Sequence, residues 1–189
     1  MFLKPFDTLN HQVILDNYVI LQRDYRWALD NRHFVDYNSM DSSLGSPTKN
    51  QYYWQMFPLI YNKEIWPHKD LDISHLDSLK VIQQLTIQPI LATFSLLLPD
   101  SDIADHEDHD EDCIAGQSDT SVIKYHYGLS CYGDCGLRVG DCVESVENGK
   151  LNIFDESITH SAYNHSTFKR GVLILSFLKS DLVPATVGI

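Results

Sequence analysis

The stretch ILATFSLLL, residues 90–98, is the first of five short β-rich runs in the second half of the chain. The other four are VIKYHYGLS (122–130), CGLRV (135–139), KLNIFD (150–155) and GVLILSFL (171–178). Each run is rich in apolar and β-branched residues and is bounded by Gly, Asp or Asn, a pattern typical of short strands. Five such strands within about ninety residues predict a mainly β domain, either a sandwich or a barrel.

The part of the chain before Pro89 is predicted to contain helices. Apolar residues recur at intervals of three and four over residues 8–30, which predicts an amphipathic helix. The polar residues 37–50 predict a loop, and the aromatic and apolar residues 54–66 predict an extended segment. Residues 72–86 predict a second helix. The candidate N-caps of this second helix are Asp72 and Ser74.

Composition and charge exclude several classes of protein. The 189 residues suit one domain, and 26 acidic against 14 basic side chains give a formal net charge of −12. A chain this acidic repels a phosphate backbone, so we expect no nucleic-acid partner. No apolar run reaches the length of a membrane span, and the start MFLKPFD lacks the apolar core of a signal peptide. We therefore expect a cytoplasmic protein with no membrane association and with reduced cysteines.

The acidic run DSDIADHEDHDED, residues 100–112, contains the first candidate metal ligands. His106 and Asp108 are two positions apart, so on an extended strand both side chains point the same way and can face one ion. His109 and Glu111 have the same spacing and form a competing pair. A solvated acidic loop and a calcium loop resembling an EF-hand are the other interpretations, although the calcium loop requires Gly where the chain has Asp105.

Two residues near the end of the chain complete this pattern. His160 is predicted at the end of one strand and Arg170 at the start of the next, so in a barrel of antiparallel strands both can point into one cavity. Two histidines and one carboxylate are the usual ligands of non-haem Fe(II) oxygenases. A guanidinium is the natural partner of a dicarboxylate. Cys131, Cys135 and Cys142 suggest a structural zinc site only weakly, because zinc sites use two close pairs.

The segments KYHYGLS (124–130) and GKLNIFDESITHSAYN (149–164), followed by Arg170 and an apolar strand, resemble the aspartyl/asparaginyl β-hydroxylase family. The earlier segments that also resemble it are YYWQMFPLIYN (52–62) and LATFSLLLPDSDIADHED (91–108). The family implies a double-stranded β-helix, a jelly-roll and cupin-like fold, with flanking N-terminal helices. On this basis residues 51–182 would form the β-helix core and its aromatic lead-in, and residues 1–50 an N-terminal helix and a candidate substrate lid.

The resemblance also implies the ligands of the cofactors. His106 and His160 match the family's two iron ligands, and Asp108 stands where some members have glycine, so the chain resembles the version with a full triad. Arg170 matches the arginine that binds the distal carboxylate of 2-oxoglutarate. Three further positions match contacts to this cosubstrate: Ser95, Lys124 and His126. Lys124 departs from the family's usual arginine and offers a point charge in place of a planar fork.

The implied activity is that of an Fe(II)- and 2-oxoglutarate-dependent dioxygenase. It would use O2 to hydroxylate an unactivated C–H of an amino acid, free or within a short peptide or carrier-bound chain. Two alternatives use the same barrel. One is a cupin-like metal enzyme of another reaction type, which would not need Arg170, and the other is a non-catalytic binding protein. The sequence leaves the substrate and the oligomeric state open.

Overall fold

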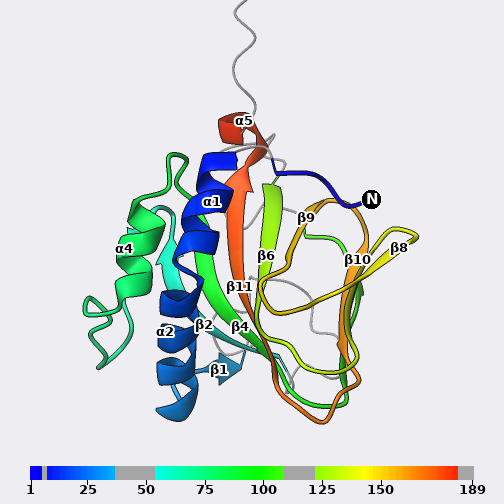
Figure 1. The fold of residues 1–189 in the computed structure, drawn as a ribbon, viewed down its shortest axis with the longest axis horizontal. Coiled ribbons are helices and arrows are strands. Elements are labelled where there is room, and N and C mark those ends of the chain that lie inside the picture. The colour runs from blue at the N-terminus through cyan, green and yellow to red at the C-terminus, as the bar shows by residue number, and fades with distance from the viewer. Residues whose placement is uncertain (6–7, 37–53, 109–121, 183–189) are drawn as a thin grey trace, which may run out of the picture.

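The computed structural model describes residues 1–5, 8–36, 54–108 and 122–182. The strands among them form two facing antiparallel sheets (Figure 1). In the large sheet the strands follow the order β1-β2-β4-β11-β6-β9, with β3 beside β2. These strands are β1 (Val35–Asp36), β2 (Trp54–Tyr61), β3 (Glu64–Ile65), β4 (Leu91–Leu97), β6 (Val122–Ser130), β9 (Leu151–Asp155) and β11 (Arg170–Leu178). The small sheet follows the order β5-β10-β7-β8. Its strands are β5 (Ser101–His106), β7 (Cys135–Val139), β8 (Cys142–Ser145) and β10 (His160–Asn164).

The path of the chain through these strands defines the fold. From β4 to β11 the chain passes back and forth between the two sheets, and only β7 and β8 follow each other within one sheet. Eight antiparallel strands wound in this way form a double-stranded β-helix, or jelly roll. The predicted fold class is therefore confirmed, and β1, β2 and β3 extend the large sheet beyond the jelly roll.

All five of the predicted β-rich runs contain strands, but β5, β8 and β10 were not among them. Their sequences SDIADH, CVES and HSAYN contain too many polar residues to stand out as apolar runs. Residues 54–66 do form extended structure, as a hairpin of β2 and β3 that turns through Asn62 and Lys63 at positive φ. The polar strands lie in the small sheet, which has water on its outer face, so the apolar pattern was too weak to reveal them.

The helix predicted over residues 8–30 is present, as α1 (Thr8–Asp16) and α2 (Tyr18–Asp30) with a break at Asn17. The second helix, α4 (Asp77–Gln83), is shorter than predicted, and a last short helix is α5 (Lys179–Leu182). The predicted N-caps of the second helix are wrong. Asp72 instead accepts a hydrogen bond from the backbone N–H of Ser74 at 2.9 Å, and the buried Asp24 of α2 accepts one from the N–H of Ser78 at 2.7 Å. A carboxylate from another helix therefore caps α4.

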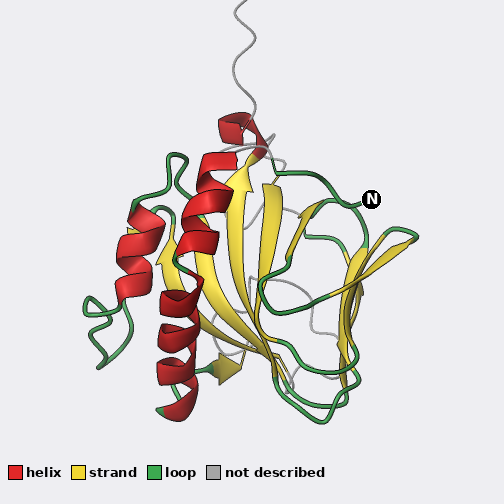
Figure 2. Cartoon of the chain, viewed as in Figure 1, coloured by secondary structure: helices red, strands yellow, loops and turns green. Residues whose placement is uncertain are grey.

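The large sheet separates two apolar cores. Helices α1, α2 and α4 cover its outer face, and the small sheet lies against its inner face (Figure 2). Because side chains alternate along a strand, Leu173 and Leu175 of β11 join the core under the helices, whereas Val172 and Ile174 join the core between the sheets. The N-terminal helices thus pack against the barrel. The loop of the candidate substrate lid, residues 37–50, lies outside the described residues. No described helix is both long and apolar enough to cross a membrane.

Asn164, the last residue of β10, connects the ends of several strands. Its side-chain amide is fully buried and donates hydrogen bonds to the carbonyls of Leu97, Leu98 and Phe168 at 2.8–3.0 Å. The amide oxygen accepts hydrogen bonds from Ser166 and from the thiol of Cys135. Asn164 therefore joins the crossing from β4 to β5 with the turn that leads into β11, where Arg170 begins the strand.

We expect the Asn164→Ala substitution to lower the free energy of unfolding by about 2–4 kcal/mol, because it leaves several buried polar groups without partners. Urea denaturation followed by circular dichroism measures this. Asn31→Ala is the matched control, because Asn31 is exposed and, within the described part of the chain, its amide donates a single hydrogen bond, to Trp27 O at the end of α2. Its loss should therefore cost less than about 1 kcal/mol. Equal losses for the two variants would contradict the role assigned to Asn164.

Candidate metal centre and cosubstrate pocket

The pairing of β5 with β10 brings the two candidate histidine ligands together. His106 is the last residue of β5 and His160 the first residue of β10, and they are direct partners in the antiparallel register. Their ring centroids are 4.2 Å apart. The sequence predicted His160 at the end of a strand, and this is wrong: His160 begins its strand and Arg170 begins the next one.

Asp108 completes the group. It lies two residues beyond the end of β5, with Oδ1 3.9 Å from Nε2 of His106 and Oδ2 3.7 Å from Nε2 of His160. The ligand atoms of the three side chains all lie within 4.8 Å of one another. In the described part of the chain, no other group of three or more His, Cys, Asp and Glu side chains has this geometry. The competing pair His109 and Glu111 lies outside the described residues.

The two histidines are oriented by their own backbone. Nδ1 of His106 lies 2.8 Å from the carbonyl of Ala104, and Nδ1 of His160 lies 2.9 Å from the carbonyl of Ile158. A carbonyl only accepts, so each Nδ1 carries the proton and each Nε2 offers a lone pair toward Asp108. Burial and the neighbouring His160 lower the pKa of His106, which favours the neutral imidazole that a metal requires.

Two alternative metal readings are contradicted. Residues 101–106 form a strand in a sheet and not a calcium loop between two helices. Cys131 and Cys135 are buried free thiols and Cys142 is an exposed one, so the described cysteines form no zinc site. Burial raises the pKa of Cys131 to about 11, and this thiol therefore stays protonated.

Lys124 lies on the inner face of β6 beside the metal cluster. Its ammonium makes a close ion pair with Oδ2 of Asp108 and a second one with Oε2 of Glu156 at 3.0 Å. Burial by itself would lower the pKa of Lys124, but the two carboxylates outweigh it and the pKa is raised. Burial likewise acts to raise the pKa of Asp108, but the ammonium outweighs it and holds that pKa well below its usual range. Sequence reasoning did not single out Glu156, although it lies in the FDES motif four residues before His160.

The other predicted site residues share the inner face of the large sheet. Ser95 of β4 pairs with Val172 of β11, and His126 of β6 pairs with Ile174 of β11. Their side chains therefore lie on the same inner face as those of Val172 and Ile174. Arg170, His126 and Ser95 are 4%, 7% and 6% exposed. The indole N–H of Trp54 donates to the Ser95 hydroxyl at 2.9 Å, which leaves the hydroxyl proton of Ser95 available to another acceptor.

Several of these buried groups have no hydrogen-bond partner among the described residues. They are Nε of Arg170 and both ring nitrogens of His126. A buried polar group without a partner costs about 1–3 kcal/mol, so these free groups are suited to contacts with a polar ligand. Burial and the nearby charge of Arg170 lower the pKa of His126 well below its usual value. A buried arginine and a neutral histidine with free donors fit a small dicarboxylate such as 2-oxoglutarate.

Phe154 of β9 contacts both His126 and His160. Its ring centroid is 5.1 Å from that of His126 and 4.9 Å from that of His160. It is fully buried in the core between the sheets. The structure thus brings Lys124 of the large sheet to the His–Asp–His cluster at the edge of the small sheet. Ser95, His126 and Arg170 lie on the inner face of the large sheet, with Arg170 at the turn that leads into β11.

Comparison with known proteins identifies a family for most of the chain. The model of a family described as aspartyl/asparaginyl beta-hydroxylase matches residues 9–180. A comparison with curated proteins gives no match.

Similar solved structures include a protein from Photorhabdus luminescens, with 12% identity, a TM-score of 0.43, and coverage of 72% of this chain and 84% of that chain. A Cupin 2 conserved barrel domain protein from Salinispora arenicola has 9% identity, a TM-score of 0.41, and coverage of 73% and 91%. A predicted oxalate decarboxylase from Thermotoga maritima has 13% identity, a TM-score of 0.41, and coverage of 66% and 80%. At these levels the likeness does not extend to function.

The lowered pKa of His126 predicts a pH-dependent stability. Below about pH 6.5 the unfolded chain binds a proton at this residue, whereas the folded chain keeps it neutral, so the free energy of unfolding falls as the pH falls. In His126→Gln this dependence should become shallower by up to about 1.4 kcal/mol per pH unit. Urea denaturation at pH 7.5, 6.5 and 5.5, with chelator present, measures the slope. Identical slopes for the variant and the wild type would contradict the assignment.

Proposed function

The chain belongs to the aspartyl/asparaginyl β-hydroxylase family, and on that premise we propose that it is an Fe(II)- and 2-oxoglutarate-dependent hydroxylase. The family implies a hydroxylase-type enzyme on a cupin fold. The observation that supports the finer proposal is that one interior contains both a His–Asp–His cluster and a buried arginine with an unpartnered N–H. The charges of Arg170 and Asp108 both act on the pKa of His126, which therefore lies near both residues.

In this proposal His106, Asp108 and His160 hold the iron. Two neutral imidazoles and one carboxylate are the ligand set that suits non-haem Fe(II), and they leave coordination positions for the cosubstrate and O2. The bound iron supplies the activation of O2 that inserts oxygen into an unactivated C–H bond. The chain contributes the fixed orientation of both Nε2 atoms, through the carbonyls of Ala104 and Ile158.

Arg170, His126 and Ser95 would bind 2-oxoglutarate. The guanidinium of Arg170 pairs with the distal carboxylate, and the Ser95 hydroxyl donates to the same group. Lys124 was expected to join this set, and two of its three ammonium protons are already directed to Asp108 and Glu156. Its third proton remains for the cosubstrate. In this proposal Lys124 therefore contacts 2-oxoglutarate as well as the carboxylates of Asp108 and Glu156.

The apolar side chains between the sheets keep the reacting groups out of water. Phe154 and Val139 are fully buried, and Val139 is the cross-strand partner of His160 on β7. A dry pocket strengthens the electrostatic contacts to the cosubstrate and limits side reactions. We propose an amino acid as the substrate, either free or within a short peptide or carrier-bound chain, with succinate and CO2 as the further products.

Anaerobic titration of the Fe(II)-loaded protein with 2-oxoglutarate tests the proposal. We expect the weak visible charge-transfer band of the chelate in the wild type, and no band in His106→Ala or His160→Ala because the iron has lost a ligand. In Arg170→Gln the iron should still bind, while the apparent 2-oxoglutarate affinity falls about 100-fold or more because a buried charge-assisted contact is lost.

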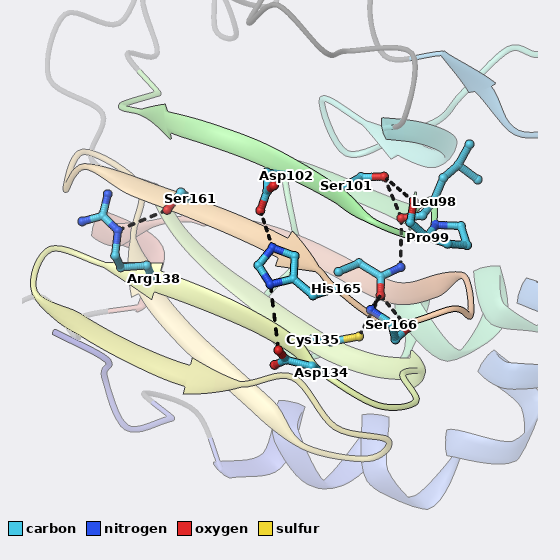
Figure 3. Close-up of polar contacts among 11 residues, drawn as sticks. Leu98, Pro99, Ser101, Asp102, Asp134, Cys135, Arg138, Ser161, His165 and Ser166 are labelled. Carbon is cyan, nitrogen blue, oxygen red and sulfur yellow. Dashed lines mark hydrogen bonds and ion pairs between the residues drawn. The ribbon is translucent and has the colours of Figure 1, made fainter.

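His165→Ala is the matched control, because this exposed histidine lies outside the proposed site, between Asp102 and Asp134 (Figure 3). It should titrate like the wild type. An iron-loaded wild type without the band would refute the cosubstrate assignment. Unchanged 2-oxoglutarate affinity in Arg170→Gln would favour a cupin-like metal enzyme of another reaction type.

A further inference from the structure

Lys124 is shared between two carboxylates of which only one belongs to the metal cluster. Its ammonium pairs with Asp108 on one side and with Glu156, at 3.0 Å, on the other. The side chain of Glu156 is 5% exposed and that of Lys124 is 16% exposed, so water screens these charges little. The charges of Lys124 and Glu156 therefore contribute strongly to the electrostatic potential at Asp108, whose own side chain is 32% exposed.

The sum of these charges shows what Glu156 contributes. Asp108 and Lys124 together would be neutral, and a divalent cation is attracted weakly to a carboxylate whose charge is already balanced. With Glu156 included, the three side chains carry a net charge of −1. Glu156 thus balances the positive charge of Lys124, and the negative charge of Asp108 remains available to a metal ion.

We propose that Glu156 sets the metal affinity of the His106–Asp108–His160 cluster by balancing the charge of the Lys124 ammonium that also pairs with Asp108. This rests on the proposed function only in that the cluster must bind a divalent metal. Lys124 acts against metal binding as a competing internal cation, and Glu156 acts for it. Both are positioning residues of the site, since in this role they act on the metal through Asp108.

Other contacts hold the Asp108 segment in place without Lys124. The backbone N–H of Asp108 donates to the carbonyl of Glu156 at 3.3 Å. The hydroxyl of Thr159 makes a close hydrogen bond to the carboxylate of Glu107. These contacts do not depend on the side chains of Lys124 or Glu156. Neutral replacements of those two side chains therefore change the charge at Asp108 more than its position.

The proposal predicts opposite changes in Mn(II) affinity for two substitutions. Lys124→Met removes the competing cation and should tighten Mn(II) binding about tenfold or more. Glu156→Gln removes the balancing anion and should weaken Mn(II) binding about tenfold. If the two residues served only to support the local structure, both substitutions would loosen the site and both would weaken metal binding.

The experiment measures Mn(II) affinity by calorimetry and by the loss of the free-ion EPR signal, without 2-oxoglutarate and without any activity assay. The matched controls are Lys63→Met and Glu64→Gln, which make the same changes at exposed positions of the β2–β3 hairpin. Both controls should bind Mn(II) like the wild type. Circular dichroism and thermal unfolding in chelator establish that each variant is folded.

The outcomes separate this proposal from the proposed function. A wild type that binds no Mn(II), or that binds it equally well after His106→Ala, would overturn both. A wild type that binds Mn(II) through His106, with weaker or unchanged binding in Lys124→Met, would overturn this proposal alone. If Lys124→Met does not fold, the nearly isosteric Glu156→Gln decides by itself, because unchanged or tighter Mn(II) binding in that variant overturns the proposal.

Discussion

The antiparallel pairing of β5 with β10 is the contact on which the candidate site depends. It makes His106 and His160 direct partners, although 54 residues separate them along the chain. A shift of the register by one residue would turn one histidine to the outer face of the small sheet. The alternating path between the sheets brings β5 and β10 side by side, and Asn164 fixes the far end of β10 to the crossing between β4 and β5.

Division of the molecule into two cores explains how a polar site is tolerated inside a small barrel. The larger core lies between the helices and the outer face of the large sheet, and it contains most of the buried aromatic and aliphatic side chains. The smaller core lies between the sheets and shares its space with Arg170, His126 and Lys124. Burial of apolar area in the larger core supplies stability that offsets the cost of polar groups held without partners in the smaller one.

Within the smaller core, charges are arranged in two different ways. Near the metal cluster Lys124 has two carboxylate partners, so these three side chains keep a net charge of −1. Near the turn before β11, Arg170 has its Nε without a partner among the described residues. The first arrangement keeps negative charge for a bound cation, whereas the second has a free donor for an anion. This difference supports the division of the interior into a metal end and a cosubstrate end.

The apolar runs of the sequence were sufficient to predict a mainly β domain and the N-terminal helical region, because such runs are local patterns. The resemblance of short motifs to a known family implied the jelly roll and the seven candidate site residues. The sequence was insufficient for the polar strands β5, β8 and β10, and for the cap of α4, which Asp24 provides from a helix distant in sequence. It also did not reveal Glu156 as the partner of Lys124, because that ion pair joins β6 to the turn after β9. Only the tertiary structure decided which carboxylate meets which cation, since ion pairs and register depend on which strands become neighbours.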